Sequence, residues 1–461
     1  MTDSSENASD TTPVARAAET FAEAEDALLS RWPETKLDPS LDRIRAFTEL
    51  LGDPQSGYPV IHLTGTNGKT STARMIDTLL RALDLRTGRF TSPHVERMTE
   101  RISVDGAPLS DEEFVAAFND VAPYTHLVDG SQEHPLSFFE TVVAMAYAKF
   151  AEAPVDVAVV EVGMGGSWDA TNVADAAVAV VLPIAVDHAK YLGDTPADIA
   201  IEKAGIIKPG SVAVLAEQTP DVATVLLARA AEVGATVARE GMEFGVVART
   251  PAVGGQVVSL QGLRARYDEV FLPLYGAHQA QNAAIALAAV EAFLSDQPLD
   301  DDVVRAAFAE VTSPGRLEII RRSPTVLLDA AHNPHGAEAL AAALDDSFVF
   351  SPLIGVIGVM GDKDAEGLLA ALEPNLAHVV CTQNSTARAM PAEQLAVTAR
   401  EIYGDHRVTV EPRLADAIDQ AAALAEAGEA VGESIGSGAV LVTGSVVTVG
   451  EARTMLKGRQ S

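Results

Sequence analysis

Short apolar runs alternate with longer amphipathic segments along most of the chain, and this alternation predicts the elements of an α/β protein. Up to residue 311, the runs that predict strands are 60–63, 87–94 (which ends in a polar turn), 155–163, 178–182 and 212–216. The segments with helical spacing of apolar residues are 14–30, 41–51, 70–83, 136–150, 199–208, 276–293 and 302–311. Between 218 and 273 the pattern is less regular, with β-like pieces at 256–260 and 269–274.

The first predicted strand leads into a glycine loop, Gly65-Thr-Asn-Gly-Lys-Thr70, and a predicted helix follows at once. In this arrangement backbone N–H groups and the helix N-terminus bind the phosphates of a nucleotide, Lys69 neutralises them, and the hydroxyl of Thr70 faces Mg²⁺. The usual pattern has a glycine five positions before Gly68, where this chain has Leu63, so the loop is a shortened variant. An ordinary strand-to-helix turn is the alternative.

A cleaner alternation begins after Thr312-Ser-Pro-Gly315, a sequence typical of a domain boundary. The predicted strands there are 326–329, 353–359, 378–381, 407–410 and 439–443, and the predicted helices are 336–344, 365–372, 392–402, 415–427 and 451–456. Five strand–helix units predict a doubly wound parallel sheet. We therefore expect a disordered acidic tail at 1–12, an ATP-binding domain at 13–311 and a C-terminal domain at 312–461. The expected fold class is α/β: an N-terminal P-loop ATPase domain with a mostly parallel sheet flanked by helices, and a Rossmann-like doubly wound C-terminal domain.

Polar residues follow several predicted strands of the first domain. Ser92 lies at the end of one strand, Glu161 near the end of another, and His188 shortly after a third. Ligands of open α/β sheets bind at the carboxyl ends of the strands, and a carboxylate beside a phosphate loop suits Mg²⁺. A loop-capping carboxylate and an ordinary loop histidine are the alternatives for Glu161 and His188. Lys203 lies on a helix that ends before a Pro-Gly pair.

Composition limits the classes of function. The net charge of −32 argues against a nucleic-acid partner, so local cations and Mg²⁺ would have to hold ATP. The single cysteine, Cys381, excludes an intramolecular disulfide framework. The chain has no run of 18 apolar residues, and its first residues lack the features of a secretory signal. We therefore expect a cytoplasmic protein without a membrane partner.

Seven motifs in order make the chain resemble a known family. They are Gly65-Thr-Asn-Gly-Lys-Thr70, Thr91-Ser-Pro-His94, Glu161-Val-Gly-Met-Gly-Gly166, Asp187-His188, Glu202-Lys-Ala-Gly-Ile-Ile-Lys208, Gln281-Asn-Ala283 and Asp329-Ala-Ala-His-Asn-Pro334. From about Leu41 onward the chain resembles folylpolyglutamate synthase/dihydrofolate synthase, one of the Mur-ligase-like ATP-dependent amide synthetases. The resemblance implies that ATP phosphorylates a carboxylate of dihydropteroate or a reduced folate. The amino group of L-glutamate then attacks the acyl phosphate, and phosphate leaves.

The resemblance also implies roles for individual residues. The implied ATP contacts are Gly65, Thr66, Asn67, Gly68, Lys69, Thr70, Asn282, Arg316 and Asp329. The implied metal ligands are Ser92, Glu161 and His188, assisted by Thr70. The implied folate or pteroate contacts are Leu41, Asp42, Arg43, Phe138 and Phe139, and the implied glutamate contacts are His332 and Ser445. The implied catalytic residues are Lys69, Lys203 and His332, and Lys203 matches a lysine that the family carbamylates with CO₂.

The cofactors implied in this way are two Mg²⁺ ions and carbamylated Lys203, with ATP as co-substrate and K⁺ as a further candidate cation. A carbamate would turn a cation that repels Mg²⁺ into an anionic oxygen ligand. The implied partners are small molecules only, namely ATP, L-glutamate and dihydropteroate or reduced folates, and the implied state is a monomer.

Two departures from the family's pattern keep alternatives open. Thr70 stands where many folate members of the family have Gly. A Thr at this position resembles the Mur ligases, so a UDP-muramoyl amino-acid ligase remains the alternative function. Only 64 residues precede Gly65, which is short for the UDP-binding domain of such an enzyme. Ala330 replaces the usual Gly, a change that affects only local backbone geometry.

A protein of another class, a nucleotide-dependent switch without chemistry, would leave the predicted glutamate contacts His332 and Ser445 unexplained. The sequence leaves open whether dihydropteroate, folyl-glutamates or both are substrates.

Overall fold

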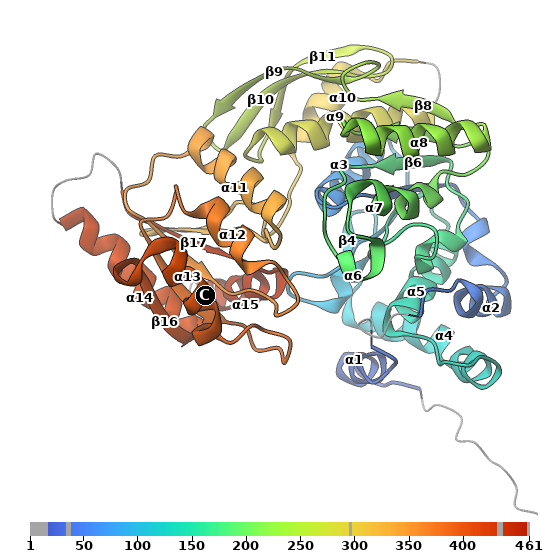
Figure 1. The fold of residues 1–461 in the computed structure, drawn as a ribbon. Coiled ribbons are helices and arrows are strands. Elements are labelled where there is room, and N and C mark those ends of the chain that lie inside the picture. Colours follow the sequence, from blue (N-terminus) through green and yellow to red (C-terminus); the bar gives the residue numbers. More distant parts are fainter. Residues whose placement is uncertain (1–16, 34–37, 295–296, 431–436, 459–461) are drawn as a thin grey trace, which may run out of the picture.

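A computed structural model describes residues 17–33, 38–294, 297–430 and 437–458. These residues form three β-sheets with helices packed on their faces (Figure 1). The two larger sheets, of eight and six strands, belong to separate parts of the chain and confirm the expected α/β class with two domains. The tail expected at 1–12 and the start of the helix expected at 14–30 lie outside the described residues.

The first sheet has the strand order β4-β3-β2-β5-β1-β6-β7-β8. Its strands are β1 (Val60–Thr64), β2 (Thr87–Phe90), β3 (Ile102–Val104), β4 (Ala107–Pro108), β5 (Val157–Glu161), β6 (Val178–Val181), β7 (Val212–Leu215) and β8 (Thr236–Arg239). All neighbouring pairs from β2 to β8 are parallel, and β3 and β4 add an antiparallel edge. Since β1 lies between β5 and β6, the glycine loop and Glu161 emerge at the same edge of the sheet.

Helices cover both faces of this sheet. One face carries α3 (Lys69–Ala82), α9 (Ala277–Leu294) and α10 (Asp301–Ala309). The opposite face carries α1 (Phe21–Leu29), α2 (Asp42–Leu50), α4 (Asp111–Ser131), α5 (Phe138–Glu152), α6 (Ala189–Leu192), α7 (Pro196–Lys203) and α8 (Pro220–Val233). The sheet is therefore buried on both sides, as its continuous apolar strands require.

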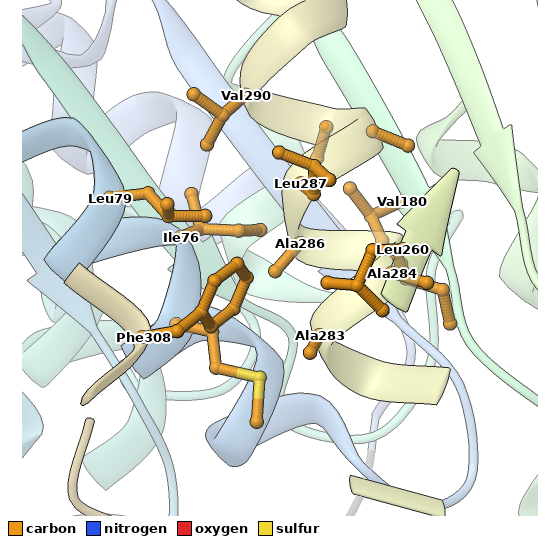
Figure 2. Close-up of a cluster of buried hydrophobic side chains, with 14 of the residues drawn as sticks. Ile76, Leu79, Val180, Leu260, Ala283, Ala284, Ala286, Leu287, Val290 and Phe308 are labelled. Carbon is orange, nitrogen blue, oxygen red and sulfur yellow. The ribbon is translucent and has the colours of Figure 1, made fainter. Parts of the chain in front are cut away.

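The packing between α3 and α9 holds the helix that carries the glycine loop. Figure 2 shows Ile76 and Leu79 of α3 in one cluster with Ala283 and Leu287 of α9 and with Phe308 of α10. These side chains are at most 1% exposed. Small alanines let α9 approach closely, and each buried larger side chain contributes roughly 1.5–3 kcal/mol. The N-terminus of α3 is therefore fixed by the core.

Several elements of this region differ from the sequence prediction. The first helix begins at Phe21, because the side chain of Thr20 caps it by accepting a hydrogen bond from the Glu23 N–H (3.3 Å). Helix α4 was not predicted, although Ser110 and Glu113 form a capping box that gives a sequence signal for its start. Helix α8 also lies in the stretch whose pattern is irregular.

The β-like pieces between 256 and 274 belong to a small sheet of their own. It is antiparallel, with the strand order β11-β10-β9. Its strands are β9 (Gly245–Ala252), β10 (Gly255–Gln261) and β11 (Arg266–Leu272). Side chains of β10 and β11 join the apolar core on the α3 and α9 side of the large sheet. This sheet therefore extends the core of the N-terminal part.

The second large sheet has the strand order β12-β13-β17-β14-β15-β16. Its strands are β12 (Glu318–Arg322), β13 (Thr325–Leu328), β14 (Leu353–Ile357), β15 (His378–Gln383), β16 (Val408–Arg413) and β17 (Ala439–Thr443). One face carries α11 (Pro334–Ser347), α12 (Ala365–Leu372) and α13 (Ala392–Tyr403), and the other carries α14 (Leu414–Ala430) and α15 (Val446–Gly458). The predicted doubly wound parallel sheet is confirmed, and the antiparallel edge strand β12 was missed.

Polar contacts join the two large sheets across the loop edge of the first. Asn67 of the glycine loop donates its side-chain N–H to Oδ1 of Asn333 (3.2 Å), and Lys363 donates to Oδ1 of Asp187 (2.6 Å). The loop therefore faces residues that follow the strands of the second sheet. No helix among the described residues is long and apolar enough to cross a membrane.

Candidate active site

The glycine loop connects β1 to α3 and depends on two glycines with positive φ. Gly65 has φ 142°, and Gly68, with φ 87°, is the N-cap of α3. A Cβ on Gly68 would lie 2.7 Å from Oδ1 of Asn282, so this position excludes a larger residue. The hydroxyl of Thr66 donates to the carbonyl oxygen of Ala185 (2.9 Å) and fixes the middle of the loop. The loop therefore ends at the N-terminus of a 14-residue helix, a place that favours anions.

Lys69 lies across this loop. Its Nζ donates to the carbonyl oxygens of Gly65 (3.0 Å) and Thr66 (3.1 Å). Burial lowers the pKa of Lys69, while the carboxylates of Glu161 and Asp187 oppose the shift. The cationic side chain is thus held over the loop, where the sequence pattern predicts nucleotide phosphates.

Glu161 is a buried carboxylate beside the loop. Both of its oxygens accept from the hydroxyl of Thr70 (2.9 and 3.1 Å), and Oε2 also accepts from the Ser92 N–H (3.4 Å). Burial raises its pKa to about 7, and Lys69 is the strongest opposing influence. A buried carboxylate with only neutral donors in direct contact gains from a bound cation. The carboxylate of Glu161 and the hydroxyl side chains of its neighbours Thr70 and Ser92 are oxygen ligands of the kind that suits Mg²⁺.

His188, a predicted metal ligand, lies next to the strongest acid of the site. It adopts a left-handed backbone conformation (φ 53°) at the N-cap of α6, and Nε2 lies 3.9 Å from Oδ1 of Asp187. Burial lowers the pKa of His188 to about 4, although Asp187 opposes the shift, so the ring is neutral and can bind a metal. Within the described ranges, no group of three or more His, Cys, Asp or Glu side chains has a metal-binding arrangement. A metal here would depend on hydroxyl, phosphate or water oxygens as well.

Lys203 is the last residue of α7 and is 2% exposed. Its Nζ donates to the carbonyl oxygen of Met164 (2.8 Å). Burial lowers the pKa of Lys203 to about 7, and the charge of Lys69 lowers it further. A large fraction of the side chain is therefore a neutral amine near pH 7, which is the form that reacts with CO₂.

Asp187 joins the first sheet to three residues of the second. Its oxygens accept from Lys363 (2.6 Å) and from the side-chain N–H of Asn333 (3.0 Å), and Nε2 of His332 lies 3.6 Å away. Burial alone would raise the pKa of Asp187, but His332, His188 and Lys363 hold it well below its usual range. The carboxylate is therefore charged and faces one side of the ring of the predicted catalytic residue His332, whose Nδ1 lies 2.9 Å from the carbonyl oxygen of Ala330.

Asp329 and Ser445 have mainly structural contacts. Asp329 accepts from the backbone N–H groups of Leu317 (2.8 Å) and Ala331 (2.9 Å). Ser445 is 2% exposed, and its hydroxyl lies 3.0 Å from the hydroxyl of Thr448 and accepts a hydrogen bond from the Thr448 N–H (3.0 Å). Asp329 thus shapes the linker, and Ser445 shapes the start of α15. Neither side chain is directed by these contacts toward the glycine loop.

The predicted folate contacts lie together at α2 and α5. Arg43 is 9% exposed and binds Glu140 (3.1 Å) and Asp38 (2.6 Å), so its guanidinium is part of a buried ion pair. Leu41 and Asp42 form the start of α2. Phe138 starts α5 under the guanidinium of Arg101 (4.9 Å), and Phe139 lies 5.9 Å from Phe90 and against Gly163, near Glu161. The structure brings these residues together, and it places Phe139 closest to the end of β5.

Sequence reasoning missed several residues at this edge, namely Asp187, Asn333, Lys363 and Arg74. Asp187 and Asn333 belong to recognised motifs, and only their neighbours were assigned roles. Lys363 follows β14 in the sequence Met360-Gly-Asp-Lys363, a polar turn after a buried strand that gives a usable signal. Arg74 lies inside α3 and has no local signal. Arg316, which was predicted, lines a pocket between the sheets together with Thr70 and Arg74.

Two family models match the chain over the regions that contain these residues. The Mur ligase middle domain matches residues 63–290, and the Mur ligase glutamate ligase domain matches residues 315–446. The dihydrofolate synthase/folylpolyglutamate synthase of Mycobacterium tuberculosis is 52% identical over 453 residues, covering 94% of this chain and 93% of that protein. The protein of the same name from Escherichia coli is 32% identical and covers 92% of this chain and 93% of that protein. The chain belongs to the dihydrofolate synthase/folylpolyglutamate synthase family.

Solved structures of the family agree with this assignment. The M. tuberculosis folylpolyglutamate synthase complexed with ADP has a TM-score of 0.92 and 52% identity, covering 95% of this chain and 98% of that one. The E. coli FolC complex with DHPP and ADP has a TM-score of 0.83 and 31% identity, covering 97% of this chain and 100% of that one. The expected class, an ATP-dependent ligase that joins glutamate to a folate carboxylate, is confirmed by these relationships.

Proposed function

We propose that the reaction takes place between the two large sheets and joins a dihydropteroate or reduced-folate carboxylate to L-glutamate. The observation that carries the proposal is the convergence of the glycine loop and Glu161 with Asp187, His332 and Lys363 at one edge. This arrangement supports transfer of the γ-phosphoryl group of ATP to the carboxylate, attack of the amine on the acyl phosphate, and release of phosphate. Positioning and charge neutralisation account for most of the catalysis in such reactions.

The nucleotide is held mainly by the glycine loop. The amides of the loop and the N-terminus of α3 bind the phosphates, and Lys69 neutralises them. Asn282 packs against Gly68, and Arg316 lines the pocket beside Thr70. Asn282, Arg316 and Asp329 bind the rest of the nucleotide, as the family resemblance implies.

Ser92, Glu161 and His188, with Thr70, would hold two Mg²⁺ ions. The support is the buried carboxylate of Glu161, whose raised pKa reflects burial without an ion-pair partner among the described residues. Bound Mg²⁺ would supply charge neutralisation at the phosphate oxygens. The role of Thr70 is to orient Glu161 through its hydroxyl.

Lys203 reacts with CO₂ to form a carbamate in the working enzyme. The nitrogen of the neutral amine bonds to the carbon of CO₂ and releases one proton, which leaves an anionic oxygen group. The support is the burial of Lys203 and its pKa of about 7, which provide the neutral amine. The carbamate would orient substrate or metal ligands next to the loop.

The remaining substrates lie on either side of this centre. His332, held by Asp187, helps to place L-glutamate, and Ser445 supports it indirectly through the start of α15. Phe138 and Phe139 hold the pteridine ring together with residues 41–43.

We also propose that the domain boundary lies between residues 311 and 312, that the enzyme is a cytoplasmic monomer, and that K⁺ assists it.

The proposal is tested by phosphate release from ATP with Mg²⁺ and L-glutamate. The acceptors to compare are 7,8-dihydropteroate and a reduced folate monoglutamate. Release with both acceptors identifies a bifunctional enzyme, and release with one assigns a single activity. Release only with a UDP-muramoyl acceptor, or release that does not depend on L-glutamate, would contradict the proposal.

A further inference from the structure

Arg74 is a partly buried arginine without a partner. It lies on α3 and lines the pocket between the two large sheets, together with Thr70, Thr91, Glu100, Arg316, Ala330 and Val446. Its guanidinium forms no hydrogen bond or ion pair within the described part of the chain. Burial of an arginine without a compensating anion is costly, so a side chain kept in this state points to an anionic ligand.

The acidic residues near Arg74 are all engaged elsewhere. Asp77 binds Arg89 (2.6 Å) and the hydroxyl of Thr87 (2.6 Å). Glu100 accepts from backbone N–H groups of the loop after β2, including those of Val95 (2.9 Å) and Arg97 (2.9 Å). Because these carboxylates are occupied, neither of them forms a hydrogen bond or ion pair with Arg74 among the described residues. Burial, and then the charge of Arg89, lower the pKa of Arg74 to about 10, and the charges of Glu100, Asp77 and Glu161 oppose this shift only in part.

Glu161 is also occupied, since it accepts from Thr70 and Ser92. The second cation of the pocket is Arg316, whose guanidinium likewise has no partner among the residues described. Val446, the first residue of α15, completes this wall and brings a helix N-terminus to the pocket. Two guanidinium groups and a helix N-terminus outweigh Glu100, the carboxylate in this lining, so the pocket favours a carboxylate or a phosphate.

The position along α3 separates these two possibilities. The phosphates of a nucleotide bind at the loop and the first residues of the helix. Arg74 lies four residues after Thr70, about 6 Å farther along the helix axis. It faces Ala330 and Val446, which are neighbours of the predicted glutamate contacts His332 and Ser445. We infer that Arg74 binds a carboxylate of the incoming L-glutamate. This inference rests on the proposed ligase function, and it adds a residue of the first domain to the amino-acid site.

The test compares Arg74→Met with wild-type enzyme in the phosphate-release assay, with each of the two acceptors. A charge-assisted bidentate contact is lost, so the KM for L-glutamate should rise at least about 10-fold with both acceptors. The KM values for ATP and for the acceptor should stay close to wild type. Arg229→Met is the matched control, because it removes the same charge from the remote helix α8. It should have wild-type constants.

Each other result contradicts the inference. An unchanged KM for L-glutamate removes Arg74 from the amino-acid site. A change confined to the reduced-folate acceptor assigns Arg74 to the carboxylate of the acceptor's own glutamate, and a rise in the KM for ATP assigns it to a phosphate. Arg74→Gln serves as a second variant if the methionine variant unfolds, with a thermal melt as the check. Wild-type enzyme that releases no phosphate with either acceptor would contradict the proposed function itself, a result distinct from those above.

Discussion

The two walls of the pocket are built in different ways. On the first wall, the loop from Gly65 to Thr70 is held by its own strand, its own helix and neighbouring strand ends of the same sheet. On the second wall, the ring of His332 is held by the carbonyl oxygen of Ala330 (2.9 Å), and both His332 and Lys363 contact Asp187, which belongs to the opposite domain. The first wall is therefore a local structure, whereas the second is complete only when the two domains meet. Changes beside the reacting atoms on the first wall should lower turnover most, and changes on the second wall should mainly loosen substrate binding.

Lys203→Ala tests the first wall and should have the largest effect. Turnover should fall about 100-fold or more, because an oriented charged group beside the reacting atoms is lost. Nucleotide affinity should remain close to wild type, since Lys203 binds Met164 rather than the loop. Steady-state turnover and ADP binding by calorimetry measure the two quantities. Lys190→Ala, on α6, is the control, and a wild-type rate in Lys203→Ala would refute the carbamate.

Asp187→Asn tests the second wall. It leaves the buried ammonium of Lys363 without its anion, and kcat/KM should fall about 10- to 100-fold through a rise in KM. The comparison variant is Arg249→Met, which breaks another ion pair between the domains. In that pair Arg249 lies 2.7 Å from the carboxylate of Asp346. That pair is more exposed, at 21% and 29%, and should change stability by less than about 1 kcal/mol. Equal effects of the two variants would show that Asp187 has no special role.

Gly450→Ala tests how closely α15 must approach the loop after β2. An added Cβ would overlap the carbonyl oxygen of Val95, so α15 must move away. We expect a loss of about 1–3 kcal/mol in the free energy of unfolding, with a weakened second wall. Gly130→Ala, in α4, meets nothing within 4 Å and should be neutral or stabilising. A stable, fully active Gly450→Ala would contradict the close contact.

The smallest effect concerns His62 on β1, beneath the loop. Its Nε2 lies 2.8 Å from the Thr171 hydroxyl, its Nδ1 has no partner among the described residues, and burial lowers its pKa to about 3. His62 therefore binds a proton less tightly in the folded chain than in the unfolded chain. Acid consequently favours unfolding: the free energy of unfolding is undiminished by His62 above about pH 6.5 and decreases as the pH falls toward 3. Thermal melts from pH 7 to 4 should show a steeper loss for wild type than for His62→Gln. His94 and His278 leave part of the slope in both. Identical slopes would contradict this assignment.

The sequence by itself determined the first wall and the order of the elements. The glycine loop, the strand before it and the helix after it are adjacent in the chain, so local periodicity and turn chemistry specify them. The parallel order of the second sheet was also predicted, because each strand–helix unit carries its own pattern. The place of Glu161 at a strand end beside the loop also pointed to Mg²⁺, whereas the roles of Lys203 and His332 came only from the family resemblance.

Only the tertiary structure decided which residues meet across the pocket. Arg74 and Val446 are far apart in the chain, as are Asp187 and Lys363, and each pair meets because two separately folded sheets dock. Contacts of this kind depend on the relative placement of two cores, and a sequence window carries no information about it. The partners of Arg43 and Ser445, Glu140 and Asn384, lie within the same domain as the residue they contact, so packing inside a single core decides these two pairs.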